Sequence, residues 1–232
     1  MLDFVKRNTV RKMNSVILSK SYTELPFCEK EILRYAGCKE ADNEIAALVR
    51  SCIDEIKTKL TYKVCYRQFG VKIGDELCDF GAFTLQSKNL AFNLNGCESA
   101  ILFAATVGVE IDRLIAKYGR ISPSKALMFQ AIGAERIEAL CDAFCADISK
   151  EYTVGTKPRF SPGYGDLPLA AQKDMFAVLS PEKQIGLTLT DSLLMSPSKS
   201  VTAIVGLTNK QEKTITNKCA LCDKRDCTFR GV

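Results

Sequence analysis

Apolar and polar positions along the chain predict helices and strands in irregular alternation. Apolar residues three and four positions apart predict a short helix over residues 28–38, which ends near Gly37, and a longer one over 42–59. Strict alternation over 62–69 predicts a strand. The next segments read as a strand pair over 75–87, broken at Gly81, and a short helix over 87–94, capped by Ser87.

The second half of the chain holds the longest predicted elements. Residues 99–108 are apolar almost throughout, as in a strand buried on both faces, and Ser122-Pro123 begins a helix that persists to about Glu151. Its predicted buried stripe is Ile137, Leu140, Phe144 and Ile148. A further helix over 169–179 precedes two alternating segments, 185–195 and 200–207, that predict a hairpin. We therefore expect an α+β fold, a single domain with long helices packed on a mostly antiparallel or mixed twisted sheet.

Length and composition favour one soluble globular domain. The 232 residues are 47% apolar and 25% charged, without a secretory signal or an apolar run of membrane-spanning length, which predicts a cytoplasmic protein with no membrane partner. We expect the domain over 1–208, including a basic lead-in over 1–25, and a cysteine-rich tail over 209–232. The net charge of +5 gathers at the termini, which indicates solvation and no nucleic-acid partner.

The absence of histidine excludes several mechanisms. No Ser-His or Cys-His nucleophile pair, no histidine-containing zinc site and no histidine ligand to a corrinoid cobalt can form from this chain alone. A Gly-rich dinucleotide fingerprint and a phosphate-binding loop are also missing. Eleven cysteines without a signal peptide argue against a disulfide framework, and four of them lie in apolar patterns expected in the core: Cys52, Cys65, Cys141 and Cys145.

The segment KPRFSPGYGDLPL, residues 157–169, interrupts the regular pattern and is called the 157–169 loop below. Three prolines and two glycines predict a defined, irregular backbone that holds Arg159 and Tyr164 five residues apart. Such a loop is suited to hold a ligand. The structural alternatives are that Arg159 caps the end of the preceding helix, that Tyr164 is a half-buried turn residue, and that Glu138 is a solvated helix residue.

The order of RFSPGYGD and then IGLTLTDSLLMSPSKSVTAIVGL resembles the S-adenosylmethionine-binding activation domain of cobalamin-dependent methionine synthase. The resemblance covers most of residues 28–208. The family's Arg-Pro-Ala-Pro-Gly-Tyr stands here as Arg-Phe-Ser-Pro-Gly-Tyr, residues 159–164, and its following Pro-Ala-Cys-Pro is replaced by Gly-Asp-Leu-Pro.

The resemblance implies a ligand site on the 157–169 loop and the long helix. Arg159 would pair with the carboxylate of S-adenosylmethionine and Glu138 would hold its amino group, while Tyr164 would contact the ligand and backbone groups of Pro162 and Gly163 would come close to it. Glu135 and Asp142 are expected on the same helix face as Glu138, three residues before it and four after.

The resemblance also implies an accessory role and not a complete enzyme. In the family, an electron donor and the methyl group of S-adenosylmethionine together restore an oxidised cobalt. The expected partners are a corrinoid-binding methionine synthase subunit, which would carry the cobalamin, and an electron donor. The alternative is a metal-stapled interaction or scaffold subunit of a corrinoid methyltransferase system that has lost S-adenosylmethionine binding. A small-molecule methyltransferase is disfavoured, because Asp166 is the sole candidate general base near the loop and no glycine-rich methyltransferase loop is present.

The tail carries a second candidate site. Cys219, Cys222 and Cys227 have a spacing that places thiolates near one metal ion, zinc or an iron–sulfur cluster, and Cys97 in a connector is the first candidate for a fourth ligand. A reduced tail and a redox-active dithiol are the alternatives.

Overall fold

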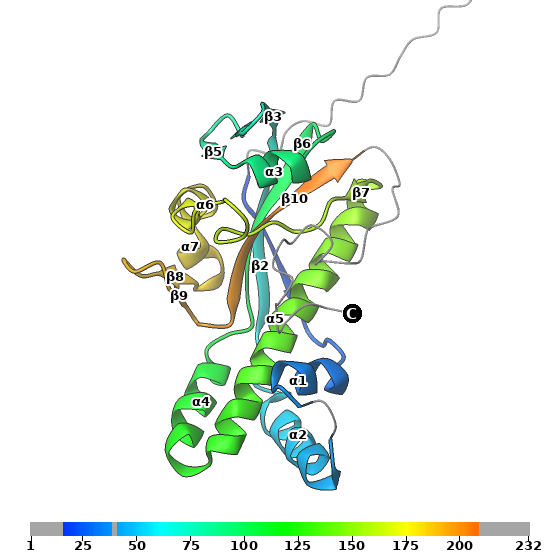
Figure 1. Cartoon of the computed structure of the whole chain (residues 1–232), viewed down its shortest axis with the longest axis vertical. Coiled ribbons are helices and arrows are strands. Elements are labelled where there is room, and N and C mark those ends of the chain that lie inside the picture. The colour runs from blue at the N-terminus through cyan, green and yellow to red at the C-terminus, as the bar shows by residue number, and fades with distance from the viewer. Residues whose placement is uncertain (1–15, 39–40, 209–232) are drawn as a thin grey trace, which may run out of the picture.

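The computed structural model describes residues 16–38 and 41–208, and its centre is a five-stranded antiparallel sheet of order β1-β2-β6-β10-β7 (Figure 1). The strands are β1 Leu18–Tyr22, β2 Tyr62–Gly70, β6 Ser99–Thr106, β7 Gly155–Thr156 and β10 Ser200–Thr208. The predicted α+β fold with an antiparallel sheet is confirmed. The tail cysteines Cys219, Cys222 and Cys227, and the start of the basic lead-in, lie outside the described residues.

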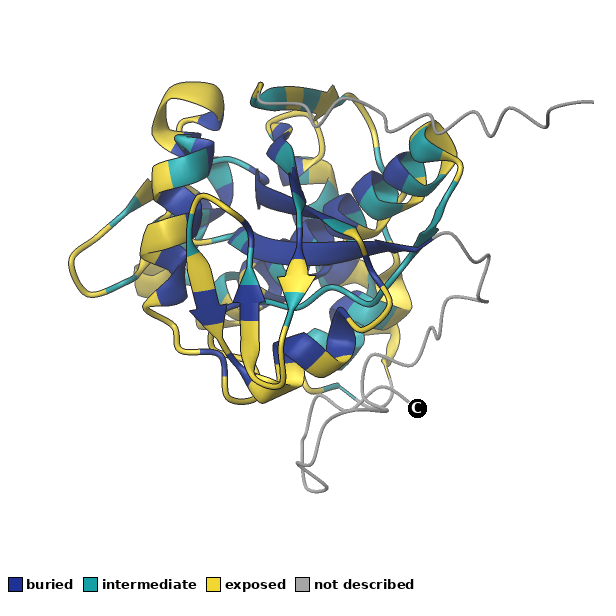
Figure 2. Ribbon diagram, turned by 90° about the horizontal axis from the view of Figure 1, so that it is seen from above, coloured by how far each residue is buried: buried dark blue, intermediate teal, exposed yellow. Residues whose placement is uncertain are grey.

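Strand β6 shows why this sequence forms a two-sided core. Ile101, Phe103 and Ala105 face one apolar cluster, whereas Leu102 and Ala104 face the other, so the strand is apolar on both faces as its sequence predicts. Figure 2 shows the central strands of the sheet almost entirely as buried, in agreement with the burial of β6 and β10.

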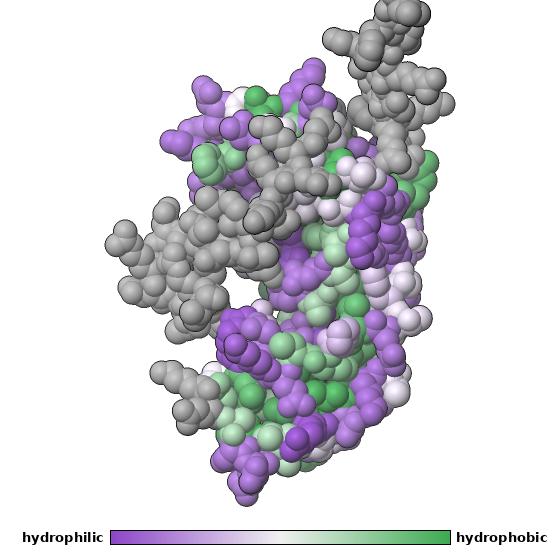
Figure 3. Space-filling view, turned by 90° about the vertical axis from the view of Figure 1, so that its right-hand side faces the viewer, coloured by the Kyte–Doolittle hydropathy of each residue, from purple (hydrophilic) through white to green (hydrophobic). Residues whose placement is uncertain are grey.

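Four helices cover the first face of the sheet: α1 Glu29–Tyr35, α2 Asn43–Ile56, α4 Glu110–Ile121 and α5 Pro123–Tyr152. Helix α5 begins at the predicted proline, and its predicted stripe is buried. None of the helices in the described part of the chain has the length and hydropathy that a membrane span requires. On the side where α1 and α5 lie, apolar surface appears mainly in the lower half, interrupted by polar residues (Figure 3).

Smaller elements cover the opposite face: α3 Lys88–Asn93, α6 Ala171–Leu179, α7 Pro181–Ile185 and a three-stranded sheet of β3 Lys72–Ile73, β4 Leu77–Asp79 and β5 Thr84–Gln86. The predicted strand pair that flanks Gly81 and the Ser87 cap of α3 are confirmed, since Ser87 Oγ accepts from Leu90 N at 2.9 Å. The elements that cover this face come from two distant parts of the sequence.

The predicted hairpin between 185–195 and 200–207 is wrong. Strand β8 Thr188–Leu189 pairs with β9 Met195–Ser196 in a small sheet of its own, with a turn closed by Thr190 N donating to Leu194 O. Strand β10 instead pairs along its whole length with β6, about a hundred residues earlier. The alternating pattern of β10 is compatible both with the predicted hairpin and with the observed pairing to β6. Pairing with β6 places β10 inside the central sheet, where both of its faces are buried.

A buried ion pair fixes the middle of α5 to the N-terminal segment. Arg136 is fully buried, and its guanidinium binds the neighbouring Glu135 carboxylate through Nε at 2.5 Å and through Nη2. It also donates to the carbonyls of Leu25 at 2.7 Å and Pro26 at 2.6 Å, and lies 4.0 Å from the Phe27 ring centroid. Each nitrogen of the Arg136 guanidinium thus donates a hydrogen bond to an oxygen, as a buried charge requires.

Candidate functional site

The loop that carries Arg159 lies along the edge of β10. Lys157 N donates to Gly206 O at 2.9 Å, and Phe160 exchanges two backbone hydrogen bonds with Ile204, at 2.9 and 2.8 Å. Arg159 stands between these contacts, so its backbone is held on both sides by the central sheet. The proline-rich sequence leaves few donors, and those on Lys157 and Phe160 are used to pair with the strand.

Arg159 joins the loop to helix α5 through two carboxylates. Its Nη2 lies 2.8 Å from Glu138 Oε2, and its Nη1 lies 2.5 Å from Asp142 Oδ1. Glu138 and Asp142 are one helical turn apart and present their carboxylates side by side. The three side chains form what we call the Arg159 cluster. The arginine side chain is 14% exposed, whereas those of Glu138 and Asp142 are 37% and 58% exposed.

Burial and charge act in opposite directions on Arg159. Burial by itself lowers the pKa of the guanidinium, but the surrounding groups Cys141, Glu138, Asp142 and Cys145 raise it above its ordinary value, and the second effect prevails. Burial also raises the pKa of the Cys141 thiol, which is therefore neutral at pH 7. The two carboxylates consequently account for the stabilised charge, and Arg159 stays protonated throughout the physiological range.

The structure bears on the structural alternatives for Arg159, Tyr164 and Glu138, while their roles as ligand residues stay a prediction. Arg159 binds side-chain carboxylates of α5 and does not act as a cap on its last carbonyls, and Glu138 is paired. Tyr164 is 67% exposed and is not a half-buried turn residue. Of the predicted ligand residues, the structure brings together Arg159 and Glu138, with Asp142 beside them.

Glu135 does not share the environment of Glu138, contrary to the expectation that both lie on one polar face. Its carboxylate is buried, pairs with Arg136 and accepts from Cys28 N at 3.2 Å. Arg136 is the next residue in the chain, but Cys28 lies more than a hundred residues earlier, so no local pattern could reveal that this pair is buried against the N-terminal segment. Glu135 is therefore a structural residue of the core.

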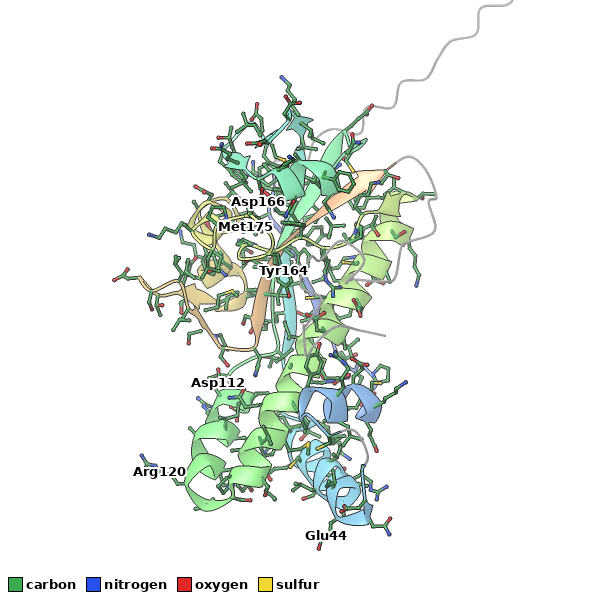
Figure 4. The ribbon with its side chains drawn as sticks, in the orientation of Figure 1. Glu44, Asp112, Arg120, Tyr164, Asp166 and Met175 are labelled. Carbon is green, nitrogen blue, oxygen red and sulfur yellow. The ribbon has the colours of Figure 1, made fainter. Side chains whose placement is uncertain are left out.

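The far half of the 157–169 loop is attached to α3. The two glycines adopt positive φ, +89° at Gly163 and +54° at Gly165, and Gly163 N donates to Leu167 O at 2.9 Å to close the bend. Pro162 is buried, and Gly163 is exposed. In Figure 4 Asp166 lies beside α3, and Tyr164 lies lower, in front of the sheet.

Asp166 holds this attachment. Its carboxylate accepts from Ser87 Oγ, from Lys88 N at 2.7 Å and from Asn89 N at 3.2 Å, which are the donors at the start of α3. The hydrogen bond from Ser87, followed by those from the backbone, lowers the pKa of Asp166 against a smaller opposing effect of burial. A carboxylate used in this way is a poor proton acceptor, which removes the one candidate general base near the loop.

Replacement of Asp166 by alanine is expected to lower the free energy of unfolding by about 1–2 kcal/mol at pH 7, the usual cost of a lost helix cap. Because the pKa of Asp166 is lowered by folding, its stabilisation is complete above the unfolded-state pKa of about 3.9 and disappears as the pH falls below it. Denaturant titrations at pH 7 and pH 3 check both statements. Asp191→Ala, in the exposed β8–β9 turn, is the control. An equal Asp166→Ala deficit at both pH values would contradict the assignment.

Cys97 lies in a connector, as predicted, but it is buried within the second apolar cluster at 6% exposure. A Cβ at Gly206 would stand 2.6 Å from Cys97 Sγ, so the thiol packs directly on β10. Within residues 16–38 and 41–208 no group of three or more potential metal ligands is present, and none of the cysteines in these ranges forms a disulfide. The metal site of Cys97 with Cys219, Cys222 and Cys227 stays a prediction.

A shallow hollow of about 570 Å³ beside Cys97, bordered by Lys88 and Phe92, is separate from the Arg159 cluster.

The sequence model of the family described as "Vitamin B12 dependent methionine synthase, activation domain" matches residues 91–220, more than half of the chain. The chain belongs to this family. The match begins within α3 and spans β6, α5, the 157–169 loop and β10, and therefore includes all three members of the Arg159 cluster. The match also extends past residue 208, where we expect the domain to end. That domain boundary stays a prediction.

The fold of this activation-domain family member is also that of a solved relative. The crystal structure of the MetH reactivation domain bound to AdoHcy aligns with a TM-score of 0.62 over 85% of this chain and 80% of that chain, at 13% sequence identity. At this identity the likeness establishes the α+β fold, with its curled antiparallel sheet and helices. No curated protein sequence matches the chain.

Proposed function

We propose that this chain binds S-adenosylmethionine at the Arg159 cluster and presents its methyl group to the cobalt of a separate corrinoid protein, most simply a methionine synthase subunit. The observation that carries the proposal is the contact of a largely buried guanidinium with two carboxylates on one helix. The family membership and the relative crystallised with AdoHcy support the choice of ligand.

The chemistry of the cluster complements an amino acid. The ligand's carboxylate requires a cationic fork, which Arg159 supplies, and its ammonium requires an anion, which Glu138 supplies. Both groups stand 2.8 Å apart on separate elements, so their spacing does not depend on a flexible segment of chain. Tyr164, exposed on the same loop, supplies an aromatic surface for the sulfonium or the adenosine.

Binding at this site is an exchange of partners. Both terminal nitrogens of Arg159 already contact protein carboxylates, so an incoming carboxylate replaces one of them. Arg159 is the more buried partner, and its backbone stays fixed between the contacts that Lys157 and Phe160 make to β10, while the more exposed carboxylates can turn toward water or toward the ligand ammonium. This arrangement keeps the guanidinium charge compensated whether or not ligand is present.

The chain's part in the reaction is to hold the methyl donor. The partner's cobalamin would supply the cobalt that accepts the sulfonium methyl after one-electron reduction by a separate donor, and Arg159 and Glu138 of this chain would hold the methyl donor in place. No histidine is present to ligate cobalt, so the cobalamin belongs to the partner. Positioning two reactants is a sufficient catalytic contribution for such a module.

Titration of the purified chain with S-adenosylmethionine tests the proposal. At a hundred times its dissociation constant the ligand is expected to add about 2.7 kcal/mol to the free energy of unfolding, a rise of about 5–10 °C in Tm for a chain of this size. The same measurement with methionine and with adenosine separates the two halves of the ligand. An unchanged Tm at millimolar S-adenosylmethionine would contradict ligand binding.

One observation favours the alternative, an interaction or scaffold subunit that has lost the ligand. The part of the loop that departs from the family pattern includes Asp166, and this residue is engaged in attaching the loop to α3. Tight association with a corrinoid protein, without any response to S-adenosylmethionine, would identify this role.

Metal analysis of the whole chain decides whether the tail cysteines hold zinc or an iron–sulfur cluster.

A further inference from the structure

Asn93, the last residue of α3, is buried and contacts the 157–169 loop. Only 5% of the residue is exposed, and its side-chain Nδ2 donates to the backbone oxygen of Pro158 at 3.3 Å. Its Oδ1 is also buried and accepts no hydrogen bond from the described part of the chain. A buried amide oxygen without a donor is unfavourable, so an apolar side chain would suit this position better if packing were its only role. Asn93 therefore requires an explanation other than packing.

The Pro158 oxygen belongs to the peptide group directly before Arg159. The peptide group directly after Arg159 is held by the sheet, because Phe160 N donates to Ile204 O at 2.9 Å. The group before it is held by Asn93. A peptide group is planar, so a contact to its oxygen also limits how its nitrogen, which is the Arg159 nitrogen, can turn. Arg159 thus leaves the backbone between two peptide groups that are held by two different elements, α3 and β10.

On the basis of the proposed function, we propose that Asn93 is a positioning residue for the ligand carboxylate. It acts through the Pro158–Arg159 peptide group, which sets the direction in which the Arg159 side chain leaves the loop. A guanidinium binds a carboxylate best when two N–H groups of the fork point at the two oxygens, and small rotations weaken this arrangement. Asn93 does not touch the ligand; it keeps the fork aligned.

The packing around Asn93 does not depend on its amide. A Cβ on Gly206 would stand 2.9 Å from Leu94 Cδ2 and 3.2 Å from Lys157 Cγ, so the end of α3 and the start of the loop meet on the same residue of β10. The far half of the loop is attached to α3 through Asp166. Loss of the Asn93 amide is therefore expected to free one peptide group and to leave the helix, the loop and the sheet in contact.

Asn93→Leu tests this role, because leucine has the same branched shape and no polar atoms. We expect the dissociation constant of S-adenosylmethionine, measured by calorimetry, to rise about three- to tenfold, the size of one neutral hydrogen bond. The Tm is expected to stay the same or to rise, since the buried Oδ1 is lost as well. Asn93→Ala, which adds no bulk, is expected to weaken binding by the same factor. The matched control is Asn95→Leu, at an exposed asparagine two residues further on, which is expected to bind like the wild type.

A second readout needs no ligand. The backbone amide of Arg159 belongs to the same peptide group as the Pro158 oxygen, so its signal in ¹H–¹⁵N NMR spectra reports the contact with Asn93. We expect this signal to shift in Asn93→Leu and to keep its position in Asn95→Leu. An Arg159 signal that does not respond to Asn93→Leu would overturn the inference.

The outcomes separate this inference from the proposed function. If Asn93→Leu and Asn93→Ala both bind S-adenosylmethionine with wild-type affinity, the inference is wrong while the proposed function stands. If affinity falls in both variants together with a drop in Tm of more than about 5 °C, Asn93 supports the fold and is not a positioning residue. If wild-type protein does not bind S-adenosylmethionine, the proposed function fails and the inference with it.

Discussion

Arg159→Gln is expected to lower the affinity for S-adenosylmethionine by about a hundredfold or more. The guanidinium is nearly buried, and each charge-assisted hydrogen bond that it makes contributes about 1.5–3 kcal/mol. Two such bonds to the ligand carboxylate amount to about 3 kcal/mol or more, which corresponds to that factor. Calorimetric titration of the variant measures the change directly.

Two further variants define the cause. Arg159→Lys keeps the charge but loses the fork, so we expect an intermediate affinity. Arg113→Gln removes an exposed arginine that pairs with Glu110 within α4, and its affinity is expected to equal that of the wild type. Thermal unfolding of each variant shows whether the fold is kept. An Arg159→Gln protein that is folded and binds the ligand within twofold of the wild type would refute the proposed site.

Glu135→Gln is expected to lower the free energy of unfolding by about 3–5 kcal/mol, although the residue is three positions from Glu138 on the same helix. The change leaves the Arg136 charge fully buried without its counter-ion, which is the costly way to break a buried ion pair. Denaturant titration measures the loss. The proposed ligand contacts are not altered, so the variant is expected to keep ligand affinity at temperatures where it is folded.

The exposed pair of Asp54 and Lys57 provides the control for this experiment. Asp54→Asn breaks a salt bridge whose side chains are more than half exposed, and we expect a loss below about 0.5 kcal/mol. The double variant Glu135→Gln/Arg136→Met removes the unpaired charge as well and is expected to regain part of the stability. A loss below about 1 kcal/mol for Glu135→Gln alone would show that the peptide carbonyls around Arg136 are sufficient.

Elements with a strong local signal were predictable from the sequence. The proline start of α5, the Asp42 and Ser87 caps of α2 and α3, and the apolar run of β6 each follow from residues within one or two turns. Strand β1 and helix α4 were not predicted. Strand β1 is short and half-exposed, with a pattern that needs β2 as its partner, and α4 follows β6 so closely that the apolar run concealed its start.

Pairing over long distances marks the limit of the sequence analysis. The pairing of β10 with β6 depends on burial of both faces of the strand in the folded sheet. A short stretch of sequence does not show which distant strand provides that burial, and the hairpin interpretation was therefore wrong. At the site, the arginine and one carboxylate were found through the resemblance, and helix periodicity placed Asp142 beside them. Periodicity misplaced Glu135, because the N-terminal segment that buries it, and from which Cys28 N donates to its carboxylate, meets it only in the folded chain.

Helix α5 combines two ionic systems within two turns. The Glu135–Arg136 pair anchors the backbone of residues 25–28, and the carboxylates of Glu138 and Asp142 hold Arg159. Both ionic systems lie on one continuous helix, so α5 holds residues 25–28 and the Arg159 cluster at the same time. Residues more than a hundred positions apart in the sequence thereby fix where the Arg159 cluster lies relative to residues 25–28.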